Sequence, residues 1–286
     1  MTSEYLKHVR PLKELHEIIE RDQASGSLEA MERLAQDVQA VAGKIAGDVE
    51  RMAARVYSEA EVESTKLMAK TAIAVSEINS DAATAAADLI SHIPPGENAK
   101  KAAMAANKIL KEAENASAKL NQCAEIAISK VADRAETAAA HVRRVAEEAI
   151  LDLTDAGKKA TDSVAKARQD VLTRFPGSTT GIQKDQSPNQ AREAASHVIK
   201  VLAQAAERVN LAAEKATAEL RTAADEAVAM VRQVAEEASA TLIAAIEDGN
   251  KTILEETEKS IMKIVSKEKF SLFDLGPLKK KWRAAG

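Results

Sequence analysis

The residue types in this sequence that can act as metal ligands, nucleophiles or acid–base groups are histidine, cysteine and paired carboxylates. The five histidines are His8, His16, His92, His141 and His197, and no two have the spacing of a metal-ligand pair. His141 and His197 stand among charged residues, as solvated surface side chains do. The single cysteine, Cys123, falls on an apolar helix face, where a thiol behaves as a small apolar residue. We therefore expect no catalytic residue, metal site or cofactor, and no enzyme.

Two pairs of adjacent glutamates could, by residue type, serve as the paired carboxylates of acid–base catalysis. They are Glu147-Glu148 and Glu236-Glu237. Arg143, Arg144 and Arg232 precede them within about one helical turn. Residues three or four apart on a helix are neighbours, so we expect these arginines and glutamates to form surface ion pairs along their own helix.

The C-terminal stretch is the candidate binding site. Three of the six aromatic residues fall in the last seventeen positions, next to a basic run. The candidate docking residues are Phe270, Leu272, Phe273, Leu275, Lys279, Lys280, Lys281, Trp282 and Arg283. This mixture of bulky apolar and basic side chains predicts docking to an anionic membrane surface or to a groove of a protein partner. The alternative is structural, a plug that covers the end of the helical bundle.

The composition of the chain predicts long helices rather than compact globular domains. Aromatic residues make up 2% of its 286 residues and charged residues 29%, while most apolar residues are alanine, the best helix former. The net charge of −4 argues against a nucleic-acid partner, which needs a basic face. The N-terminus does not resemble a signal peptide, and no apolar run approaches the ~18 residues that span a bilayer. We expect a cytoplasmic protein, with peripheral attachment to a membrane or granule as the alternative.

Proline positions divide the chain into three helical stretches, because proline breaks helix interiors. The breaks at Pro94-Pro95-Gly96 and at 176–187, followed by Ser187-Pro188, predict helices at 28–93, 98–175 and 188–270. Each helix would be roughly 100–125 Å long at ~1.5 Å per residue. Short connections favour antiparallel neighbours. We therefore predict an all-α, elongated antiparallel bundle of three nearly straight helices at 27–270, preceded by an amphipathic arm with a short helix at 1–26 and followed by the tail at 271–286.

Large aliphatic residues recur every eleven positions within each helical stretch. The series are Leu34, Ile45, Val56, Leu67, Ile78 and Leu89; Ile109, Leu120, Val131, Val142, Leu153, Val164 and Phe175; and Val198, Val209, Leu220, Val231, Leu242, Ile253 and Ile264. Small residues fill most of the steps between them. An eleven-residue (hendecad) repeat predicts straight or weakly right-handed helices, in contrast to a left-handed heptad coiled coil. Gly43-xxx-Gly47 adds a prediction of close contact with another helix at that point.

The second and third helical stretches resemble each other at an offset of 89 residues. Residues 142–149 read VRRVAEEA and residues 231–238 read VRQVAEEA. This similarity predicts that a unit of one helix and one turn was duplicated.

Three functional interpretations follow. The first is a non-enzymatic structural scaffold that self-associates, as a homo-oligomer, and binds partners. The second is a coat on a membrane, lipid or granule surface: in its eleven-residue period and alanine-rich composition the chain resembles apolipoproteins and granule-coating phasins, although no motif of either family is present. The third is a signalling coil, because the Ala- and Glu-rich runs resemble the cytoplasmic coils of chemoreceptors. Those coils use heptads and a distinctive hairpin tip, and this chain departs from both.

Overall fold

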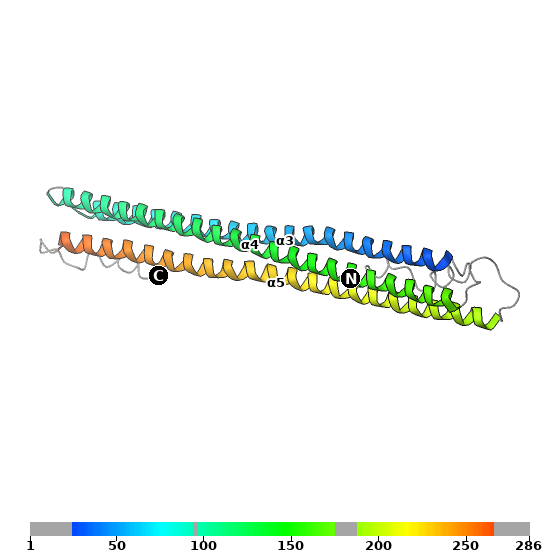
Figure 1. Cartoon of the computed structure of the whole chain (residues 1–286). Coiled ribbons are helices and arrows are strands. Elements are labelled where there is room, and N and C mark those ends of the chain that lie inside the picture. Colours follow the sequence, from blue (N-terminus) through cyan, green and yellow to red (C-terminus); the bar gives the residue numbers. More distant parts are fainter. Residues whose placement is uncertain (1–24, 94–96, 175–187, 266–286) are drawn as a thin grey trace. The chain divides into compact units, whose positions relative to one another are not determined.

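Three long α-helices make up the described part of the chain. The structure is a computed structural model, and it describes residues 25–93, 97–174 and 188–265. Helix α3 spans Ser25–Ser91, α4 spans Glu97–Arg174 and α5 spans Pro188–Val265 (Figure 1). The helices pack against one another, and the described residues contain no strand. The predicted all-α bundle of three long helices is therefore confirmed.

The observed ends of the helices differ from the predicted ones by a few residues. Helix α5 starts at Pro188 as predicted, and α4 is displaced by one residue at each end. Helix α3 starts at Ser25, three residues before the predicted start. The N–H groups of a first turn have no carbonyl acceptor four residues earlier, so the helix tolerates Gly26 at this position. It ends at Ser91 and not at Ile93, because a residue before proline is pushed out of the helical region. The His92 N–H still donates to the Asp88 carbonyl at 3.2 Å.

The remaining predictions about the ends of the chain lie outside the described residues. They concern the short helix of the arm at 1–24, the last predicted turn of α5 at 266–270, and the tail at 271–286.

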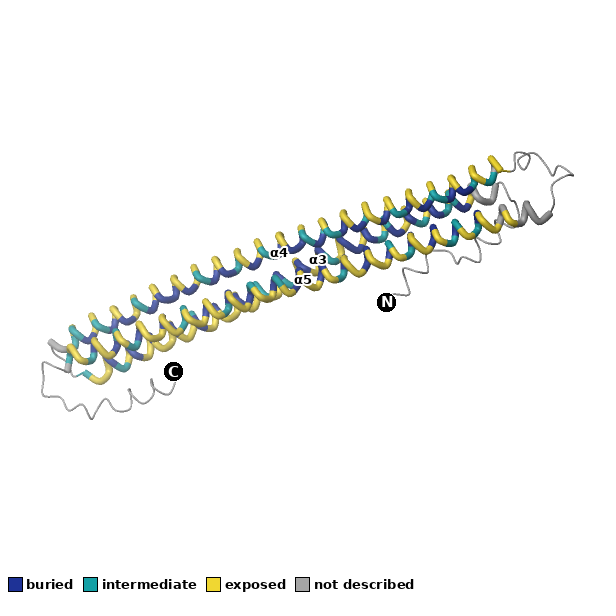
Figure 2. Tube along the Cα trace, turned by 60° about the horizontal axis from the view of Figure 1, so that its bottom comes forward, coloured by how far each residue is buried: buried dark blue, intermediate teal, exposed yellow. Residues whose placement is uncertain are grey.

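The core is built from the aliphatic residues that recur every eleven positions. All of them between Leu34 and Leu89, between Ile109 and Val164, and between Val198 and Ile253 are buried. Ile264 is half-buried, and Phe175 lies outside the described residues. Buried alanines fill most of the space between these side chains. Figure 2 shows the result: buried positions follow one face of each helix, and exposed positions follow the opposite face.

The helices divide into two compact units. The first contains α3 up to Tyr57, α4 from Glu136 and α5 up to Ala229. Within it, the Arg143 guanidinium of α4 binds the Glu50 carboxylate of α3, with Nη2–Oε2 at 3.1 Å and Nε–Oε1 at 3.3 Å. Gly157 of α4 faces Val38 of α3. Because the later residue of α4 meets the earlier residue of α3, these two helices are antiparallel in this unit.

The second unit contains α3 from Ser58, α4 up to Ala135 and α5 from Met230. Here α3 and α5 are parallel, since Glu59 pairs with Arg232 and Lys70 with Ser239. Helices α4 and α5 are antiparallel: Lys108 pairs with Glu256, and Ala116 lies nearer the start of α5, at Gly249.

Glycine marks a close helix contact at a different place from the one predicted. A Cβ atom on Gly43 or Gly47 would meet nothing within 4 Å, so the predicted contact at these glycines is wrong. Both lie about 200° around the helix from buried Ile45, which turns them away from the neighbouring helices. The close contact is at Gly157, where an added Cβ would lie 2.8 Å from Val38 Cγ2.

Candidate functional site

The predicted docking residues cannot be placed in the structure. Phe270, Leu272, Phe273, Leu275, Lys279, Lys280, Lys281, Trp282 and Arg283 all lie outside the described residues. Their role stays a prediction. The described helices contribute two other features, a set of polar contacts that connect them and a groove between α4 and α5.

The arginines beside the glutamate pairs do not bind those glutamates. Arg143 reaches across to Glu50 and Arg232 to Glu59, both on α3, while Arg144 Nη2 lies 3.2 Å from His141 Nδ1. The predicted ion pairing along one helix is therefore wrong for these residues. The physical reason is orientation, because an acidic residue stabilises a helical pair better when it precedes the basic one, and here arginine comes first. Arg143 and Arg232, related by the 89-residue offset, instead bind the same neighbouring helix.

Charged side chains connect every pair of helices in the first unit. Besides Arg143 and Glu50, Arg55 of α3 approaches Asp225 of α5 at 3.6 Å. Lys215 of α5 approaches Asp152 of α4 at 3.5 Å. The hydrogen bond from Arg143 and its positive charge lower the pKa of the Glu50 carboxyl below its ordinary value. This shift indicates a pair that favours the charged form of both partners.

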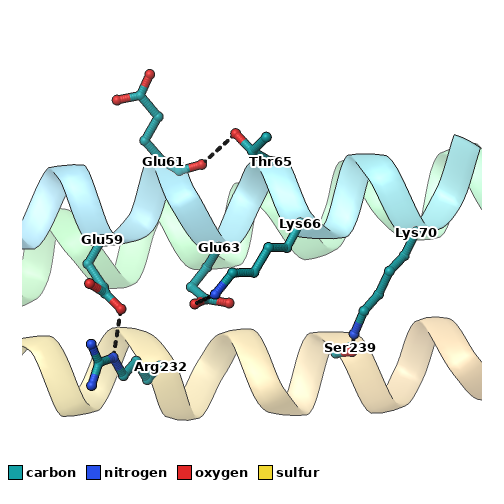
Figure 3. Close-up of polar contacts among 8 residues, drawn as sticks. All are labelled: Glu59, Glu61, Glu63, Thr65, Lys66, Lys70, Arg232 and Ser239. Carbon is teal, nitrogen blue, oxygen red and sulfur yellow. Dashed lines mark hydrogen bonds and ion pairs between the residues drawn. The ribbon is translucent and has the colours of Figure 1, made fainter.

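In the second unit, polar contacts connect α5 to each of the other two helices. Arg232 Nε donates to Glu59 Oε1 at 2.6 Å and Lys70 Nζ donates to Ser239 Oγ at 2.7 Å. Both pairs connect α3 and α5 (Figure 3). Lys108 Nζ of α4 lies 2.7 Å from Glu256 Oε1 of α5. The hydrogen bond from Lys108 is the largest cause of a lowered pKa at Glu256, although partial burial opposes it.

A groove of about 400 Å³ lies between α4 and α5 in the second unit. Its lining residues are Glu112, Asn115, Ala116, Lys119, Gln122, Cys123 and Ile126 of α4 with Ala245, Asp248, Gly249 and Thr252 of α5. The hollow exists because the facing positions are small, with Gly249 opposite Ala116. Cys123, predicted to act as a small apolar core residue, is half-buried and lines this groove. A small residue on each of two facing helices could have predicted the groove. The spacing of residues within the sequence does not show that Ala116 and Gly249 face each other.

The described histidines and acidic residues form no group that could hold a metal ion. His92 is exposed at the end of α3, with its Nδ1 atom 2.8 Å from the Asp88 carbonyl oxygen. Among the described helices, none has a stretch sufficiently long and apolar to cross a bilayer.

Comparison with known proteins gives no family for this chain. No family model matches the sequence. No curated protein matches it. A solved structure, the haptoglobin-hemoglobin receptor of Trypanosoma congolense, is similar over 85% of this chain and 96% of that chain, with 19% identity and a TM-score of 0.29. A similarity at this TM-score supports no inference about the present chain.

Proposed function

We propose that the protein is a non-enzymatic helical scaffold that acts through self-association and partner binding. One observation carries the proposal: the large aliphatic side chains of the described helices are buried against one another, and charged side chains connect the helices in both units. Side chains used in this way hold a long helical support together. The outer faces of such a support are then available for contacts with other molecules.

Exposed leucines in the first unit favour contact with a second copy. Leu151 and Leu211 are both highly exposed. Leu151 directly precedes Asp152, and Leu211 lies one turn before Lys215, so both leucines stand beside the ion pair that connects α4 and α5. A second copy covering them would remove apolar surface from water, which is the main favourable term in most associations.

Sedimentation equilibrium of the full chain tests this proposal. We expect a mass that is a multiple of the 30.5 kDa chain. Leu151→Gln combined with Leu211→Gln should shift the equilibrium toward single chains. Lys130→Gln, a change at an exposed position about 31 Å from Leu151 along α4, should not. A single-chain mass at every concentration would refute self-association.

A coat function is the second candidate, and the charge distribution favours it. Residues 266–286 contain six basic and two acidic side chains and so carry +4, whereas the other 265 residues carry −8. A basic, aromatic tail is suited to an anionic surface that the acidic helices would avoid. We expect the full chain to sediment with vesicles of phosphatidylcholine and phosphatidylserine. Replacing Lys279, Lys280 and Lys281 by glutamate should abolish this binding, and equally weak binding by both proteins would exclude a coat function.

A further inference from the structure

The groove between α4 and α5, with a volume of about 400 Å³, has room for a bulky side chain. Ala116 and Gly249 line it from opposite helices. A Cβ atom added to Gly249 would be in ordinary van der Waals contact with Ile78 Cδ1, at 3.4 Å. At one end Ile126 is exposed. Met104, Asn115 and Ile126 are spaced by eleven residues and therefore share one face of α4. Asn115 and Ile126 line the groove, and the highly exposed Met104 lies on the same face of α4, nearer the start of that helix.

The C-terminal tail can reach this groove. Gly249 lies sixteen residues before Val265, the last residue of α5, which corresponds to about 24 Å along the helix at ~1.5 Å per residue. An extended chain covers that distance in about eight residues at ~3.3 Å each. Phe273 is the eighth residue after Val265, so a tail that turns back along α5 brings its aromatic residues to the level of the groove.

Charge favours the same pairing. The tail carries +4 and the rest of the chain −8. Glu112 and Asp248 lie on the rim of the groove, opposed by the single basic residue Lys119 among its lining residues. Lys279–Lys281 follow Phe273 by six to eight residues, and can therefore lie along the acidic helices while the aromatic residues fill the hollow.

We propose that the tail of the same chain docks into the groove between α4 and α5, with Phe273 or Trp282 inserted over Gly249 and the basic run held by the acidic rim. The docked state withholds the aromatic and basic side chains from any external surface. This regulatory role rests on the surface-binding function proposed for the tail, because release from the groove would make the tail available to an anionic membrane.

Two unique residues allow a direct test. Cys123 is the only cysteine and lines the groove, and Trp282 is the only tryptophan and lies in the tail. We expect Cys123 of the folded full chain to react with a thiol reagent about tenfold more slowly than in a full-length Phe273→Ala, Trp282→Ala variant, which corresponds to ~1.4 kcal/mol of docking free energy. The tryptophan emission of the unmodified chain should be blue-shifted and should move to longer wavelength with added salt.

Matched charge reversals locate the docking site. Asp248→Lys on the groove rim should accelerate the reaction of Cys123 and shift the Trp282 emission to longer wavelength. Asp81→Lys should leave both unchanged. Asp81 is exposed on α3 and lies eleven residues after Lys70, so the two share one face of that helix. Lys70 binds Ser239, which lies on the side of α5 opposite Asp248. Circular dichroism should show both variants to be as helical as the original chain.

Three outcomes would overturn the proposal, and a fourth separates it from the coat function. Equal Cys123 reactivity in the full chain and in the tail variant overturns it, as does an equal effect of Asp248→Lys and Asp81→Lys. Protection of Cys123 that disappears on dilution also overturns it, because the groove would then hold the tail of a second copy. Protection of Cys123 in a chain whose Asp248→Lys variant, with the tail released, still binds no vesicle supports the docking while excluding the coat function, so the two failures are distinguishable.

Discussion

Alanine substitutions at three glycines of the first unit separate the effect of helix propensity from that of helix packing. Gly43, Gly47 and Gly157 all lie within long helices, where glycine costs about 1 kcal/mol relative to alanine. Gly43 and Gly47 have open space around an added Cβ atom, so alanine there should raise the free energy of unfolding by about 0.5–1 kcal/mol at each position.

Gly157→Ala should behave in the opposite way. The added Cβ atom would lie 2.8 Å from Val38 Cγ2 and 3.1 Å from Cγ1. Val38 is only 6% exposed, and a β-branched side chain in a helix has one strongly preferred rotamer, so its two methyl groups cannot easily move away. Overpacking typically costs about 1–3 kcal/mol. Set against a propensity gain of about 1 kcal/mol, the net effect is a loss of roughly 0–2 kcal/mol of stability.

Urea unfolding followed by far-ultraviolet circular dichroism measures these differences. The decisive comparison is between Gly47→Ala and Gly157→Ala, which should differ by about 1–3 kcal/mol because only the second is overpacked. Removing the obstructing methyl groups with Val38→Ala should make Gly157→Ala favourable, and a double-mutant cycle measures that coupling. If Gly157→Ala stabilises the chain as much as Gly47→Ala does, the close contact between α3 and α4 at this point is refuted.

Two further predictions concern the core and the ion pairs. On α5, Leu220 is 1% exposed and Met262 is 63% exposed, so Leu220→Ala should destabilise the chain by about 2–5 kcal/mol and Met262→Ala by under about 0.5 kcal/mol, as urea unfolding would show. Because Lys108 lowers the pKa of Glu256, the stabilisation by this pair should be present above the unfolded-state pKa of glutamate and should disappear as the pH falls through the lower folded-state pKa. A side-chain NMR titration should therefore show the pKa of Glu256 rising in Lys108→Gln, and an unchanged value would contradict the contact.

The sequence predicted those parts of the fold that depend on local physics. Proline is excluded from helix interiors but tolerated in the first turn, so the start of α5 at Pro188 could be predicted from the sequence. The apolar residues repeated every eleven positions had to share one helix face, and residues such as Val131 and Leu220 are fully buried as that reasoning requires.

Contacts between helices could not be predicted in the same way. Arg143 has Glu147 four residues away, and nothing in the sequence shows that Glu50, 93 residues earlier, is its partner. Gly43 and Gly47 have the spacing of a packing motif but lie on an outer face, whereas Gly157 carries no motif and packs closely. Which residues meet depends on how two helices align, and that information is distributed over both helices.

The ion pairs between helices have a consequence for this alignment. A core whose large residues repeat every eleven positions can be buried almost equally well after one helix slides past another by eleven residues, about 16 Å. Between α4 and α5 the charged partners do not repeat in the same way. After such a slip Asp152 is replaced by His141 or Ser163 opposite Lys215, and Glu256 is replaced opposite Lys108 by Ala245 or, outside the described residues, by Lys267. The surface charges between α4 and α5 thus select one register of these two helices from several that the core alone would accept.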